Sequence, residues 1–316
     1  MTTPAPLLAV DNLCVNFGPS QVVDRVSFEV AAGEKFALVG ESGSGKSVTA
    51  LSVLRLLETA TYSGRIRFEG EDLLQKSERE MQGLRGRDVA MIFQEPMTAL
   101  NPLYTVGNQI AEVLELHEAL DSKRAHDRAI DLLARTGIPD PREKVDAYPH
   151  QLSGGQRQRA MIAMALACRP KLLIADEPTT ALDVTIQAQI LALLDDLQGE
   201  FGMAILFITH DLNLVRRFTH RVGVMERGRL VEQGATAEVF ARPQDPYTVK
   251  LINSRPERAV QPVPADAPVL AATRGVNVDF VSVKGWFGRN VFHAVRDATL
   301  ELRRGETLGL VGAAGS

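Results

Sequence analysis

A run of glycines that ends in lysine and serine gives this chain the composition of a phosphate-binding loop. The run is Gly40-Glu-Ser-Gly-Ser-Gly-Lys-Ser47, and it follows directly after the apolar residues 36–39. Closely spaced glycines let successive backbone N–H groups turn toward an anion, and a helix beginning there adds its dipole. Lys46 would then reach the β- and γ-phosphates of a nucleotide, and Ser47 would bind Mg²⁺. The competing interpretation is a glycine-rich turn that merely enters a helix.

The expected nucleotide contacts of this loop come from all eight positions: Gly40, Glu41, Ser42, Gly43, Ser44, Gly45, Lys46 and Ser47.

Two consecutive carboxylates end a second apolar run, Leu172-Leu-Ile-Ala-Asp176-Glu177. At a strand tip, Asp176 would face the Mg²⁺ shell and Glu177 would face the attacking water as a candidate general base. An apolar run followed by Asp-Glu is also a common strand end. The pair therefore carries weight only together with the other motifs.

A second candidate anion site lies at Leu152-Ser-Gly-Gly-Gln156, which precedes a helical pattern. A serine and two glycines before a helix present free N–H groups to an anion. One chain does not need two such sites for one triphosphate. We therefore expect Ser153, Gly154, Gly155 and Gln156 to contact the nucleotide of another subunit.

The elements that must position these groups follow from the apolar pattern. Short β-like runs before residue 31 predict a small antiparallel sheet, and residues 47–57 have a helical pattern that opens at the loop. Apolar runs at 89–93, 171–175 and 203–209 suit central parallel strands. Residues 106–138 read as amphipathic helices. The expected class is α/β: a P-loop NTPase with a mainly parallel core sheet, an antiparallel β subdomain and an inserted α-helical subdomain.

Composition excludes several classes of protein. The formal net charge of −4 offers no global basic field for nucleic acid, so no nucleic-acid partner is expected. Cys14 and Cys168 lie far apart without metal-ligand spacing, which suits a reducing compartment. The N-terminus lacks the pattern of a signal peptide, and the longest apolar stretch, 160–168, is too short to span a bilayer.

The motifs together resemble, from residue 7 to about 254, the ATP-binding subunits of ABC transporters. The resemblance implies ATP and Mg²⁺ as ligands and ATP hydrolysis as the activity. Gln94 stands where the family has a glutamine that touches Mg²⁺ or water, which adds it to Ser47 and Asp176 as a metal contact. His210 matches the histidine that contacts the γ-phosphate, so Glu177, His210 and Gln94 are the implied catalytic residues. Ala181-Leu-Asp183 matches a loop that implies a nucleotide contact for Asp183.

Phe17 falls where the family places an aromatic residue against adenine. An ordinary core phenylalanine near a strand end is a serious alternative for this position.

Three further segments, 93–102, 148–156 and 246–252, are similar to the dipeptide and oligopeptide (nickel/microcin C type) importer branch. That branch implies two transmembrane permease subunits, an extracytoplasmic solute-binding protein, and a peripheral location on the cytoplasmic face of the inner (plasma) membrane. The solute would be a di- or oligopeptide or a peptide-like compound. Alternatives are a nucleotide-binding fragment without turnover and a soluble non-transport ATPase of the same superfamily.

An internal repeat sets the expected domains. Residues 305–316 align with residues 33–44 at an offset of 272, and the chain ends before the lysine of the second loop. We expect an ATP-binding domain at 7–254 with a helical subdomain at about 95–160, a linker at 255–268, and at 269–316 the start of a second, incomplete ATP-binding domain. This resembles fused members with two ATPase domains, truncated in the second. The partner of the first domain would be a second ATPase domain or another copy of the chain.

Overall fold

The computed structural model describes residues 5–95, 99–180, 183–254, 262–264, 266–284 and 288–311. The chain divides into two compact units. The first holds residues 1–182 and 186–254, and the second holds residues 255–316 together with 183–185. Each unit is described by itself.

A six-stranded sheet forms the centre of the first unit, in the order β10-β9-β3-β8-β7-β6. Every pairing is parallel except that of β10 with β9. Every residue of the four strands β3, β6, β7 and β8 is buried, which explains why they read as continuous apolar runs. The strands are β3 (Lys35–Val39), β6 (Val89–Ile92), β7 (Leu172–Asp176), β8 (Ala204–Thr209), β9 (Arg221–Glu226) and β10 (Arg229–Ala235). The expected α/β class with a mainly parallel core sheet is confirmed.

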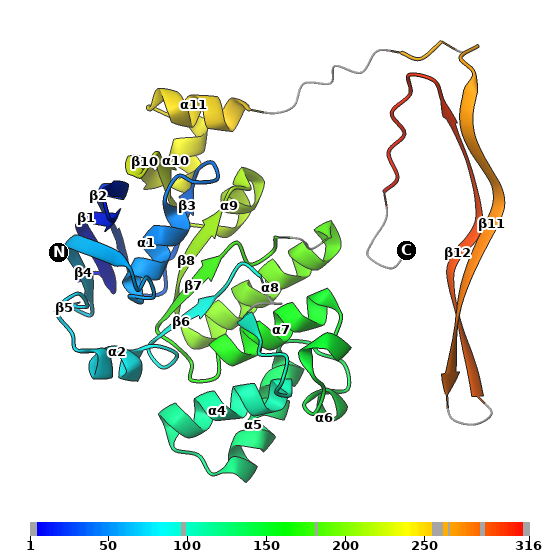
Figure 1. Ribbon diagram of the computed structural model, residues 1–316. Coiled ribbons are helices and arrows are strands. Elements are labelled where there is room, and N and C mark those ends of the chain that lie inside the picture. The colour runs from blue at the N-terminus through cyan, green and yellow to red at the C-terminus, as the bar shows by residue number, and fades with distance from the viewer. Residues whose placement is uncertain are drawn as a thin grey trace. The chain divides into compact units, whose positions relative to one another are not determined.

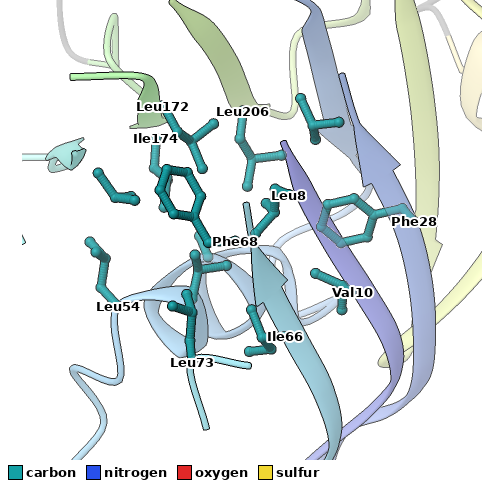
Figure 2. Packing of buried hydrophobic residues seen from close by; sticks show 14 of the residues in the cluster. Leu8, Val10, Phe28, Leu54, Ile66, Phe68, Leu73, Leu172, Ile174 and Leu206 are labelled. Carbon is teal, nitrogen blue, oxygen red and sulfur yellow. The ribbon is translucent and has the colours of Figure 1, made fainter. Parts of the chain in front are cut away.

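A four-stranded antiparallel sheet, in the order β2-β1-β4-β5, packs against this core. Its strands are β1 (Leu8–Phe17), β2 (Ser20–Val30), β4 (Ala60–Phe68) and β5 (Glu71–Asp72). Figure 2 shows how their apolar side chains meet those of β7 and β8, with Leu8 and Phe68 near Leu172 and Leu206, and the same apolar cluster extends from there to Phe28. This shared cluster fixes the antiparallel sheet beside the strand that leads into the glycine loop.

Helices flank the two sheets. They are α1 (Lys46–Val53), α2 (Glu78–Leu84), α8 (Val184–Phe201), α9 (Leu212–Phe218), α10 (Thr236–Ala241) and α11 (Pro246–Asn253). The helix expected over residues 47–57 ends early, at Val53, because Arg55 adopts a left-handed conformation (φ 51°) that a helix cannot continue. None of the helices in the described ranges has the length and apolarity needed to cross a bilayer.

The region between β6 and β7 is helical and has a core of its own (Figure 1). Its helices are α4 (Val106–Glu118), α5 (Ser122–Arg135), α6 (Pro141–Lys144) and α7 (Gly154–Ala165), with a 3₁₀ turn at Pro149–Gln151. One face of α7 joins this core through Ala160 and Ala163, and another joins the core under the parallel sheet through Met161 and Ile162. Helix α7 therefore connects the helical region to the central sheet.

The second unit contains one antiparallel hairpin, β11 (Val269–Lys284) with β12 (Gly288–Arg303). Every residue pair between β1 and β2 recurs in it: Leu13↔Val26, for example, becomes Val276↔Ala298, and Phe17↔Ser20 becomes Phe280↔Phe292. Even the unusual backbone recurs, since Arg25 (φ 51°) and its counterpart Asp297 (φ 48°) are both left-handed. The hairpin thus repeats the pairing of the first unit. The second copy of the loop, from residue 312 onward, lies outside the described residues.

Candidate active site

The glycine-rich loop follows β3 and opens α1, as its composition predicts. Gly45 caps α1 with φ 98°, and Gly40 has φ 153°. A Cβ atom on Gly40 would lie 2.2 Å from the Met225 carbonyl oxygen of β9. The loop entrance therefore has room for glycine only, because any side chain would collide with the neighbouring strand.

The Lys46 side chain is folded back across this loop. Its ammonium group is buried and donates hydrogen bonds to the carbonyl oxygens of Gly40 and Glu41, both at 2.8 Å. Burial lowers the pKa of Lys46, while the charges of Glu177 and Asp176 oppose that shift. An anion in the loop would compensate the buried positive charge, and phosphate oxygens would replace the two carbonyl partners.

Asp176, the last residue of β7, supplies the first of the paired carboxylates. Its side chain is buried, and the Ser47 hydroxyl donates to its Oδ1 at 3.1 Å. Burial raises the pKa of Asp176, against the lowering effect of the Ser47 hydrogen bond. A hydroxyl and a carboxylate side by side are hard oxygen donors of the kind that Mg²⁺ prefers. The two residues therefore fit a magnesium ion beside the phosphate loop.

Glu177 brings together the other expected catalytic residues. Its Oε1 lies 3.0 Å from Nδ1 of His210, and its Oε2 accepts hydrogen bonds from Thr180 Oγ1 at 2.8 Å and Gln94 Nε2 at 3.3 Å. Gln94 follows β6, Glu177 follows β7 and His210 follows β8, so all three lie at the carboxyl edge of adjacent parallel strands. This edge is where ligands bind in open α/β sheets.

The electrostatics of Glu177 favour an ionised carboxylate. Burial alone would raise its pKa, but the hydrogen bonds from His210 and Thr180 lower it, and the net pKa lies below the ordinary value. The backbone N–H of Glu177 donates to the Ile208 carbonyl at 2.9 Å, and the residue has φ 45°. The carboxylate is therefore held in place by its backbone as well as by its side-chain partners.

The second candidate anion site is the N-terminus of α7. Ser153 caps this helix and forms a reciprocal capping box with Gln156, while Gly154 is exposed and has open space where a side chain would stand. No hydrogen bond in the described part of the chain joins Ser153, Gly154, Gly155 or Gln156 to residues 40–47. The structure therefore does not bring these residues to the loop of the same chain.

Two further residues, Phe17 and Asp183, were expected to contact the nucleotide. Phe17 ends β1 and packs, half buried, against the core of the antiparallel sheet. Asp183 stands immediately before α8, and residues 181–182 of its motif lie outside the described residues. Their contacts with nucleotide stay predictions.

Three residues near the site were not expected from the sequence. Thr180 binds the Glu177 carboxylate, and Gln158 of α7 donates to the Pro178 carbonyl at 2.5 Å, which links that helix to the segment after Glu177. The Tyr247 hydroxyl accepts a hydrogen bond from the Glu41 N–H at 3.1 Å. A polar residue three positions after a carboxylate could have signalled Thr180, whereas the other two contacts join distant segments and leave no local pattern.

Comparisons with known proteins identify the family of this chain. Residues 23–180 match the family model described as "ABC transporter". The chain is 53% identical over 319 residues to the "Uncharacterized ABC transporter ATP-binding protein YejF" of Escherichia coli K12, covering 98% of this chain and 60% of that protein. It is 53% identical over 262 residues to the "Dipeptide transport ATP-binding protein DppD" of the same organism, covering 80% of this chain and 79% of that one.

A solved structure shares the fold of the first unit. It is the dimeric post-hydrolysis state of the ATP-binding cassette MJ0796 bound to ADP and Pi, with TM-score 0.64, 28% identity, and coverage of 72% of this chain and 98% of that one. The chain spans about 60% of the length of the YejF relatives that it matches over nearly all of its own length. With its phosphate loop, paired carboxylates and these similarities, the chain belongs to the ABC transporter family and carries its ATP-binding domain.

Proposed function

We propose that this chain binds and hydrolyses ATP to drive an ABC importer of di- or oligopeptides or peptide-like compounds. The observation that carries the proposal is the ionised Glu177 carboxylate, in contact with His210 and Gln94 at the same sheet edge as the phosphate loop. Such a carboxylate suits the activation of water for attack on a γ-phosphate.

The roles of the residues follow from their positions. The loop N–H groups would bind the phosphates, and Lys46 would exchange its two carbonyl partners for phosphate oxygens. Ser47, Asp176 and Gln94 would hold Mg²⁺, which neutralises charge on the β- and γ-phosphates. Glu177 would orient the water and accept its proton, and His210 would stabilise charge developing on the γ-phosphate.

The N-terminus of α7 is proposed to act on a second subunit. It is exposed, and its capping box satisfies two of its backbone N–H groups, those of Ser153 and Gln156, while Gly154 leaves space for a ligand. The solved cassette MJ0796 is described as dimeric. In a pair of this kind, Ser153, Gly154, Gly155 and Gln156 would face the nucleotide held by the loop of the partner. Phe17 and Asp183 are proposed as further nucleotide contacts.

The transport role rests on the relatives, since DppD is described as a dipeptide transport protein. The proposed partners are two permease subunits and an extracytoplasmic solute-binding protein, with the chain on the cytoplasmic face of the membrane. The repeated hairpin register supports the division into an ATP-binding domain at 7–254, a linker at 255–268 and the first part of a second such domain at 269–316. A second ATPase domain or a second copy of the chain would complete the nucleotide site.

The test is Mg²⁺-dependent ATP hydrolysis by the full chain against protein concentration, compared with Gly154→Asp. This position has no heavy atom within 4 Å of an added Cβ, and a carboxylate at a helix N-terminus does not disfavour the helix. We expect the variant to fold and to bind ATP through its own loop, but to lose the hydrolysis that rises with concentration, because its charge repels the phosphates of the partner's ATP.

Gly199→Asp is the matched control, since Gly199 is an exposed helical glycine that also has open space around it. It should hydrolyse ATP as the unaltered chain does. Full hydrolysis by Gly154→Asp would contradict the action in trans, and binding without hydrolysis by the unaltered chain at every concentration would favour a nucleotide-binding module without independent turnover.

A further inference from the structure

Tyr247 connects the last helix of the first unit to the start of the phosphate loop. Its ring is buried in the apolar cluster that includes Val39 and Val224, and its hydroxyl accepts a hydrogen bond from the Glu41 N–H at 3.1 Å. The two residues lie 206 positions apart in the sequence. Burial raises the pKa of Tyr247, so the phenol is neutral at physiological pH.

The hydrogen bond acts on one particular peptide group, the one that joins Gly40 to Glu41. This group contains the Glu41 N–H and also the Gly40 carbonyl, which accepts the Lys46 ammonium at 2.8 Å. In a planar trans peptide the N–H and the C=O point in opposite directions. Tyr247 and Lys46 therefore hold the same rigid group from opposite sides.

This peptide group needs external partners because Gly40 has no side chain to restrict its rotation. The Met225 carbonyl leaves no space for a Cβ at Gly40, so a larger residue at this position cannot limit the rotation of the peptide group. Lys46 is a temporary partner, since its ammonium must leave the two carbonyl oxygens to reach a phosphate. The Tyr247 hydroxyl is the partner that can stay in place while nucleotide binds.

We infer that Tyr247 is a positioning residue, which keeps the first peptide group of the phosphate loop in its binding orientation when Lys46 turns to the nucleotide. The inference rests on the proposed function, because it assumes that the loop binds ATP. A residue of α11, far from the loop in sequence, would thus contribute to the affinity of the loop for nucleotide.

The experiment uses Tyr247→Phe in the full chain, with the affinity for the non-hydrolysable analogue adenylyl imidodiphosphate and the KM and kcat for ATP as readouts. Losing one net hydrogen bond corresponds to about threefold to tenfold weaker binding. The loop contacts phosphates in the ground state and the transition state alike, so KM should rise by about the same factor while kcat changes little.

Tyr62→Phe is the matched control. Tyr62 of β4 is a partly buried tyrosine, and its hydroxyl donates to the Leu57 carbonyl at 3.3 Å instead of binding the loop. We expect this variant to keep the affinity and KM of the unaltered chain. A merely structural role for Tyr247 would lower the folded fraction, and with it the apparent kcat, without a change in KM.

A second variant guards against a failure of Tyr247→Phe to fold. The Asp245 carboxylate caps α11 by accepting the Tyr247 N–H at 2.8 Å. Asp245→Ala removes this cap but keeps the Tyr247 hydroxyl, so it should also lower the affinity for the nucleotide analogue. Unchanged affinity and KM in the folded variants, or an equal loss in Tyr62→Phe, would overturn the inference and leave the proposed function standing. If the unaltered chain bound no nucleotide, the proposed function would fail, and the positioning role with it.

Discussion

Replacing Glu177 by glutamine tests the chemical step directly. Glutamine has nearly the same shape, so its carbonyl oxygen can still accept from Thr180 and Gln94, and its amide can donate to Nδ1 of His210. The change therefore removes the charge and the basicity of the side chain while its contacts can persist. A general base typically contributes a factor of about 10² to 10⁴ to a rate, so hydrolysis should fall by about that much.

The same geometry sets the expectation for binding. The described hydrogen bonds of the Glu177 side chain go to Gln94, Thr180 and His210, and none goes to residues 40–47. The affinity of the variant for ATP should therefore stay within about threefold of that of the unaltered chain, which is the size of effect expected of a substitution that removes no direct contact. The assay pairs phosphate release under single-turnover conditions with equilibrium nucleotide binding. Glu238→Gln, an exposed change on α10, serves as the control. Hydrolysis at a near-normal rate in Glu177→Gln would refute the assignment of the base.

Two further predictions concern residues that support the site, Gly40 of the loop and Glu232 of β10. Gly40→Ala places a Cβ 2.2 Å from the Met225 carbonyl, so nucleotide binding should be lost and the free energy of unfolding should fall by about 1–3 kcal/mol. Urea denaturation measures the change beside Gly199→Ala, a helical position outside the loop where an added Cβ meets no atom within 4 Å. For Glu232, burial raises the pKa, but the N–H groups of Gln244 and Asp245 help to lower it below its ordinary value of 4.5. A depressed folded-state pKa gives stability above the unfolded pKa that is lost as the pH falls through the folded pKa. Glu232→Gln should therefore lower the free energy of unfolding at neutral pH, with the difference from the unaltered chain shrinking below pH 4.5; a constant difference at all pH values would contradict it.

The sequence predicted those parts of the site that depend on local pattern. The apolar run at 36–39 followed by glycines located a buried strand and its loop, because a strand buried on both faces shows no polar alternation and a run this short before glycines suits a strand better than a helix. Asp176 and Glu177 were placed at a strand end by the same reasoning, although the strand itself covers Leu172–Asp176 and not 171–175. The roles assigned to these residues stay predictions.

What the sequence could not predict depends on contacts between distant segments or on single backbone angles. Nothing near Arg55 announces the left-handed residue that ends α1, since its neighbours Leu54 and Leu57 continue the apolar pattern and are still used in the core. Tyr247 belongs to a segment that resembles one branch of the family, yet its contact with Glu41 arises only when α11 packs on the parallel sheet. Periodicity carries no information on such pairs.

The two hairpins differ in length but share the same strand pairing. Each paired residue of β1 corresponds to a residue of β11 that lies 263 positions later, and each paired residue of β2 corresponds to a residue of β12 that lies 272 positions later. The second copy therefore has nine more residues at the turn, and the register of the strands before the turn is unchanged. The register of a hairpin is set by the pairing of its strand residues, so residues added at the turn lengthen the hairpin without shifting the existing pairs. The turn at Gly18–Pro19 in the first copy is accordingly a place where natural variation, or a genetically inserted tag, can lengthen the chain without shifting a single pair of the sheet.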